Sequence, residues 1–110
     1  MFEIVAGDFG APYKIVVKKL DLSLCTAKMS VWRGSIYLFK DKDCGVVTYE
    51  PDKDESFFYY TVSDENFPLT AAVEGEITVY KAMIEFIKAG YKEHDLGFQW
   101  SVHPAPPVST

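Results

Sequence analysis

The segment ITVYKAMIEFIKAG, residues 77–90, carries two competing hydrophobic periodicities. With a period of two, as in a strand, one apolar face consists of Tyr80, Ala82, Ile84 and Phe86. With a period of 3.6, as in a helix, the apolar stripe consists of Val79, Met83, Phe86 and Ile87. In the helical case Gly90 would form the C-terminal cap. The class of the fold depends on which period the chain follows.

The residues around this segment favour the strand. ITVY at residues 77–80 is β-branched and aromatic, and no helix cap precedes it. GFQWSV at residues 97–102 alternates in the same way, and YKEHD at residues 91–95 can connect the two segments as a hairpin. We therefore expect an antiparallel hairpin here, with a helix at about residues 78–89 as the alternative.

Short segments of strand-like sequence recur through the rest of the chain. They cover residues 2–5, 13–18, 27–33, 36–39, 46–49 and 57–62. The charged segments DKD at 41–43 and EPDKDE at 50–55 are expected to be turns. Seven or eight short strands at this spacing are typical of a sandwich or barrel. The sequence predicts one all-β sandwich domain over residues 1–103 and a flexible Pro-rich tail at 104–110, or an α+β domain if the helix forms.

Composition limits the classes of partner. The chain has 110 residues, of which 48% are hydrophobic and 15% aromatic, enough for one core. Its net charge is −5, and no cluster of Lys or Arg exceeds a pair, so we do not expect a nucleic-acid partner. No apolar run approaches the roughly 18 residues of a membrane span, and the start lacks the features of a signal peptide. We expect a cytoplasmic protein without a membrane partner.

Residues that could carry out catalysis or bind a metal are few. Cys25 and Cys44 lack a second cysteine at metal-ligand spacing, and both are expected to be reduced thiols in the cytoplasm. His94 and His103 are the only imidazoles, and their acidic sequence neighbours diverge along a strand or turn. We therefore expect no catalytic residue, no metal site, no cofactor and no enzymatic activity.

Aromatic side chains are the best candidates for a binding surface. FFYY at residues 57–60 cannot be buried entirely in a two-layer fold, because successive side chains of a strand point to opposite faces. One of the two tryptophans is expected in the core, and the other would be a contact anchor if exposed. The candidate protein-binding residues are Trp32, Phe58, Tyr60 and Trp100.

The order of several motifs extends over most of the chain. GDFGAP at residues 7–12 precedes an apolar strand, and DLS at 21–23 precedes the next one. Glu85 and Phe86 end an alternating segment, and FQWSV at 98–102 forms the last one. This order resembles the immunoglobulin-like domain at the N-terminus of tailed-phage baseplate upper proteins and of related small phage tail proteins.

The resemblance implies an immunoglobulin-like antiparallel β-sandwich with a non-enzymatic structural role in a phage or prophage tail or baseplate. Its partners would be other virion proteins, bound through protein–protein contacts, with a homo-oligomer as a further option. The chain would be cytoplasmic in the host during synthesis and would then enter the virion. The alternative is a small binding protein, either a carbohydrate-binding β-sandwich or a phage-borne inhibitor of a host protein.

Overall fold

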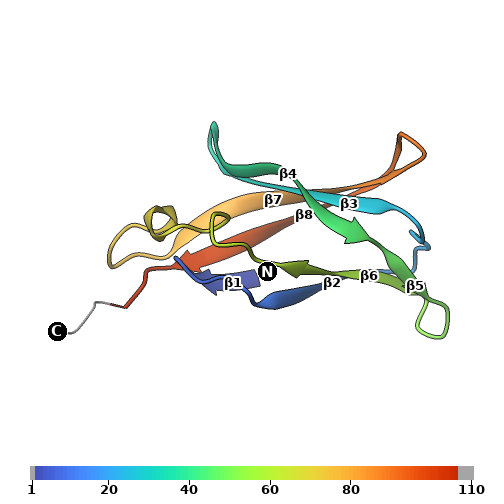
Figure 1. The fold of residues 1–110 in the computed structure, drawn as a ribbon, viewed down its shortest axis with the longest axis horizontal. Coiled ribbons are helices and arrows are strands. Elements are labelled where there is room, and N and C mark those ends of the chain that lie inside the picture. The colour runs from blue at the N-terminus through green and yellow to red at the C-terminus, as the bar shows by residue number, and fades with distance from the viewer. Residues whose placement is uncertain (1, 107–110) are drawn as a thin grey trace.

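The computed structural model describes residues 2–106, which form two β-sheets packed face to face (Figure 1). The five-stranded sheet has the order β1 (Phe2–Val5), β8 (Tyr91–His103), β7 (Thr78–Lys88), β3 (Thr26–Arg33) and β4 (Ile36–Val46). The three-stranded sheet has the order β2 (Pro12–Lys18), β6 (Glu55–Thr61) and β5 (Thr48–Glu50). One short 3-10 helix, η1, covers Leu69–Ala71. The predicted β-sandwich is confirmed.

The segment with two periodicities forms strand β7, so the helical alternative is wrong. Tyr80, Ala82, Ile84 and Phe86 point into the core as the period of two predicts. The connection to β8 is shorter than expected: Ala89 and Gly90 have φ values of 52° and 82°, which suits a two-residue turn that follows the twist of the strands. Residues 91–95, predicted as the connection, therefore belong to β8.

The expectation of a wholly antiparallel sandwich is wrong at the N-terminus. Strand β1 pairs with β8 in parallel, with Phe2 opposite Trp100 and Ile4 opposite Val102. This register directs the side chain of Ile4 into the core, where it is 5% exposed. The pairing joins the two ends of the described chain, a contact that no local pattern encodes.

The charged segment at residues 41–43 is not a turn but part of the edge strand β4. The β3–β4 register shifts at several points, and Asp41 has a φ value of 53°. The Asp41 backbone N–H donates a hydrogen bond to the Ser30 hydroxyl oxygen at 3.0 Å. An edge strand can carry such charges because one side of it faces solvent. From β4 the chain passes through buried Val47 into β5, and so crosses from one sheet to the other (Figure 1).

The DLS motif forms a corner that is attached to the three-stranded sheet. Asp21 Oδ1 accepts a hydrogen bond from the Ser23 backbone N–H at 2.9 Å, as in a local turn. Leu22 is 4% exposed, and its backbone N–H donates to the Ser56 hydroxyl at 2.8 Å. Ser56 donates in turn to the Leu20 carbonyl at 2.7 Å. The hydroxyl of one fully buried serine thus pairs with the Leu22 N–H and with the Leu20 carbonyl of the corner.

Residues 104–106 have no regular secondary structure, and the remainder of the predicted tail, 107–110, lies outside the described residues. In the described range 2–106, the structure contains no helix with the length and apolar character needed to cross a membrane.

Candidate functional site

Strand β6 buries the two aromatic residues that we expected at the surface and exposes the other pair. Phe58 and Tyr60 are 3% and 1% exposed, whereas Tyr59 is 55% exposed and Phe57 is half-buried on the outer face. Phe58 packs edge-to-face against Phe86 of the opposite sheet at 6.0 Å. The assignment of Phe58 and Tyr60 to a binding surface is therefore wrong, because their side chains lie on the face of β6 that points to the core.

Trp100 is also a core residue and not a surface anchor. Its indole is fully buried, and the ring centroids of Tyr13 and Phe67 lie 5.0 and 4.9 Å from it. Phe2, Tyr60 and Phe98 also belong to the cluster, with ring centroids 5.3, 5.9 and 6.3 Å from that of Trp100. The indole Nε1 has no hydrogen-bond partner among residues 2–106.

Trp32 is the one of the four candidates whose position allows contact with another molecule. It lies on the outer face of the five-stranded sheet and is partly exposed. Its ring is 5.9 Å from that of Tyr37 on the neighbouring strand β4, and Tyr37 is 49% exposed. Lys40 Nζ lies 5.4 Å from the Tyr37 ring centroid.

A second pair of aromatic side chains lies on the outer face of the three-stranded sheet. Phe57 and Tyr59 meet edge-to-face at 6.0 Å between ring centroids. Lys14 of β2 stands opposite Tyr59, and its Nζ lies 4.7 Å from the Phe57 ring centroid. Val16 stands opposite Phe57. We call Lys14, Val16, Phe57 and Tyr59 the aromatic face. The motif FFYY indicated that two aromatic side chains would lie on the outside of the strand, but alternation alone could not say which two.

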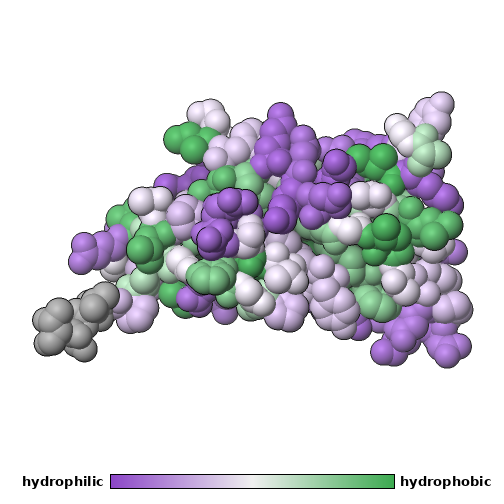
Figure 2. Space-filling model, in the orientation of Figure 1, coloured by the Kyte–Doolittle hydropathy of each residue, from purple (hydrophilic) through white to green (hydrophobic). Residues whose placement is uncertain are grey.

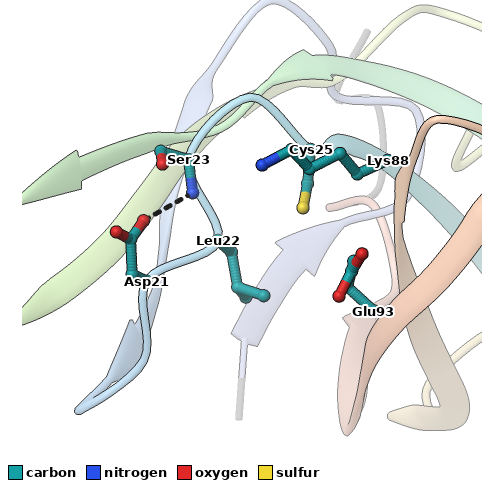
Figure 3. A pocket seen from close by; sticks show the side chains of 6 residues that line it. All are labelled: Asp21, Leu22, Ser23, Cys25, Lys88 and Glu93. Carbon is teal, nitrogen blue, oxygen red and sulfur yellow. Dashed lines mark hydrogen bonds between the residues drawn. The ribbon is translucent and has the colours of Figure 1, made fainter.

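A small pocket of about 170 Å³ lies at the end of the sandwich that carries the DLS corner (Figure 3). Asp21 and Ser23 line one side, and Lys88 and Glu93 of the β7–β8 hairpin line the other. Hydrogen bonds from Ser23 lower the pKa of the Asp21 carboxyl, while burial raises the pKa of the Cys25 thiol. A thiol that stays protonated is a poor nucleophile, and the volume is below the roughly 300 Å³ of most small-molecule sites.

Metal-ligating and thiol groups are dispersed in the structure. Nowhere in the described part of the chain do three or more His, Cys, Asp or Glu side chains converge to hold a metal ion. Cys25 and Cys44 are both free thiols, as expected. The aromatic face, in contrast, brings two contacting aromatic rings and a lysine ammonium group together on one surface.

No family model, curated protein or solved structure matches this chain.

The Cys44 thiol provides a pH-dependent test of the packing between β4 and the core. Burial raises its pKa from 9.0 to about 11, so the folded state favours the neutral thiol. This contribution to stability is complete below pH 9 and is lost as the pH rises toward 11. We expect the free energy of unfolding, measured by urea denaturation, to fall by about 1–2 kcal/mol over this range because of Cys44.

The variant Cys44→Ser supplies the control, since a serine hydroxyl does not titrate there. Its free energy of unfolding should decline less steeply with pH than that of the natural protein. Burial also raises the pKa of Tyr60, so some decline should remain in the variant. Equal slopes for the two proteins would contradict the assignment to Cys44.

Proposed function

We propose that this protein is a non-enzymatic assembly module that binds another protein through the aromatic face. The observation that supports this proposal is the contact between exposed Tyr59 and half-buried Phe57 on the outer face of the middle strand of a sheet. Aromatic side chains are enriched in the cores of protein–protein interfaces, where they supply large contact areas at a small cost in side-chain entropy.

The position of the aromatic face suits a docking surface. Strand β6 lies between β2 and β5, so both neighbours restrain the backbone that carries Phe57 and Tyr59. The inner side of the same strand is anchored in the core by Phe58 and Tyr60. A partner would therefore meet rings that are already held in place, which reduces the entropy lost on binding.

We further propose that the partner belongs to a phage tail or baseplate and that the protein is a structural component of the virion. This part of the proposal rests on the motif order, from GDFGAP to FQWSV, and on the β-sandwich that accompanies it. A tail component would occur in a copy number set by the symmetry of the tail, either alone as a homo-oligomer or with other virion proteins.

The test is mass spectrometry of phage particles induced from a strain that produces this chain. We expect the natural protein in purified particles, and we expect the double variant Phe57→Ser, Tyr59→Ser to be reduced at least about tenfold there, because both anchors are lost. The control is Met83→Ser, which changes a partly exposed apolar side chain on the outer face of the other sheet.

The outcomes separate the two parts of the proposal. Absence of the natural protein from particles, while it is abundant in the lysate, would contradict the virion assignment. Equal incorporation of the natural protein and the double variant would contradict the role of the aromatic face. A rise in the melting temperature with a sugar ligand, lost in the double variant, would favour the carbohydrate-binding alternative instead.

A further inference from the structure

The two sheets end in four edge strands that differ in their capacity to accept another strand. β1 has four residues and β5 has three, so each offers a short edge. β4 is long, but its register is irregular and the run from Lys40 to Asp43 is charged. Figure 2 shows hydrophilic side chains gathered where β4 crosses the centre of the view. Charges and bulges of this kind protect an edge from pairing.

Strand β2 has no bulge, and its only charged residues are Lys14 and Lys18, which disfavour pairing with a basic strand but not with an acidic one. Its seven residues pair with β6 in one unbroken antiparallel register, and no strand in residues 2–106 pairs with its other side. Pro12, which cannot donate a hydrogen bond, stands only at its first position. The contact with β1 lies near this start, where the Tyr13 hydroxyl donates to the Glu3 carbonyl at 3.0 Å. The edge beyond Tyr13 is open (Figure 1).

Hydrogen bonds at the two ends of the β2–β6 pair show which residues face the open edge. At one end the Val62 N–H donates to the Ala11 carbonyl at 3.2 Å, and at the other the Lys19 N–H donates to the Asp54 carbonyl at 2.6 Å. In an antiparallel pair, residues bound to the partner strand alternate with residues that face away from it. Odd-numbered residues of β2 therefore bind β6, and even-numbered residues face away.

The even-numbered residues Lys14, Val16 and Lys18 thus direct their backbone N–H and C=O groups to the open edge. The spacing of these groups matches the spacing that a new antiparallel or parallel strand requires. The same three side chains point to the outer face of the sheet, where Lys14 stands opposite Tyr59, Val16 opposite Phe57 and Lys18 opposite Glu55. Neither Lys14 nor Lys18 forms an ion pair within the part of the chain that the structure describes.

We propose that β2 binds an extended acidic segment of a partner protein, which adds to the three-stranded sheet as a fourth strand. Its backbone would bond to Lys14, Val16 and Lys18, and its acidic side chains would lie beside the two lysines. Opposite charges across neighbouring strands stabilise the pair, and like charges destabilise it. The proposal rests on the assembly role given above and specifies the partner of that surface.

The same lysines argue against a second copy of β2 as the occupant. In each register that uses the free groups of even-numbered residues, lysines of the two copies would stand opposite or diagonal to one another. The repulsion would be strongest where Lys14 faces Lys18 of the other copy. An acidic strand meets no such conflict.

The experiment titrates the isotope-labelled full chain with a short peptide of alternating glutamate and valine, and with the matching lysine–valine peptide. Amide hydrogen exchange is then measured by NMR. We expect the acidic peptide to slow exchange at Lys14, Val16 and Lys18 and to leave the β7 amides unchanged. The basic peptide should have no effect on exchange, and added salt should weaken the binding of the acidic peptide.

Two variants separate the backbone contribution from the charge contribution. Val16→Pro removes an N–H that points to the open edge and leaves the β6 hydrogen bonds intact, so the chain should fold and its affinity for the acidic peptide should fall at least about fivefold. Val16→Thr keeps the N–H and should bind as the natural protein does. The double variant Lys14→Glu, Lys18→Glu should lose the preference for the acidic peptide.

Three results would overturn the proposal. The first is absence of binding by the acidic peptide, and the second is equal binding of both peptides. The third is binding that changes the NMR chemical shifts of Phe57 and Tyr59 without slowing hydrogen exchange at the β2 amides. If Val16→Pro enters phage particles normally while the Phe57→Ser, Tyr59→Ser variant does not, strand addition is wrong and the assembly role of the aromatic face stands.

Discussion

Replacement of Trp100 by alanine is expected to lower the free energy of unfolding by about 3–5 kcal/mol, the largest effect of any single change considered for this protein. Trp100 is fully buried and lies between the two sheets. Its ring contacts Phe2 of β1, Tyr13 of β2 and Phe67 of the loop after β6. The alanine variant would leave a cavity among aromatic rings, whose stiff side chains can fill it only in part.

Urea denaturation followed by circular dichroism would measure this effect, since tryptophan fluorescence changes with the substitution itself. Trp32→Ala is the matched control: it removes the same side chain from a partly exposed position and should cost less than about 1 kcal/mol. Similar losses for the two variants would mean that Trp100 does not centre the core. The loss of unfolding free energy for Trp100→Phe should lie between the losses of the two alanine variants. Phenylalanine keeps an aromatic ring at this position and removes an indole N–H that has no partner among the described residues.

Asn66→Ala is expected to destabilise the protein by about 2–3 kcal/mol, although it deletes few atoms. Asn66 is 2% exposed, and its Oδ1 accepts hydrogen bonds from the Tyr60 hydroxyl at 2.6 Å and from the Ser63 N–H at 3.0 Å. Without this amide the buried Tyr60 hydroxyl loses its partner. The cost of an unsatisfied buried donor exceeds the net value of the hydrogen bond itself.

A double-mutant cycle tests this cause. Tyr60→Phe removes the hydroxyl, so the change from Asn66→Ala should be at least about 1 kcal/mol smaller in the Tyr60→Phe background than in the natural protein. The free energies come from urea denaturation of the four proteins at neutral pH. Additive losses would contradict the network, because they would show that the two side chains act independently.

Local patterns determined most of the secondary structure. The alternation from Tyr80 to Phe86 predicted a strand and its buried face, and the β-branched and aromatic residues before it favoured the strand over a helix of good intrinsic propensity. Within the predicted turn 50–55 the structure forms a turn at residues 51–54, and the DLS corner also forms as its side chains predict. These features depend on neighbours within a few residues, which is the range over which a sequence pattern acts.

The candidate surface shows where this range ends. All four residues of FFYY are aromatic, so hydrophobic alternation carries no information on which pair is buried; the contact of Phe58 with Phe86 and the Tyr60–Asn66 hydrogen bond decide it. Trp32 and Trp100 are likewise equivalent as residue types, and only the convergence of the aromatic cluster around Trp100 separates core from surface.

The sequence by itself therefore determined that this chain forms β-strands with alternating apolar residues, joined by turns and packed around an aromatic core. Only the tertiary structure decided the parallel pairing of β1 with β8, the incorporation of the charged residues 41–43 into an edge strand, and the open edge of β2. Each of these depends on contacts between residues far apart in the chain. The free energy of such contacts comes from joint burial and from strand-to-strand hydrogen bonds, and neither can be read from one segment at a time.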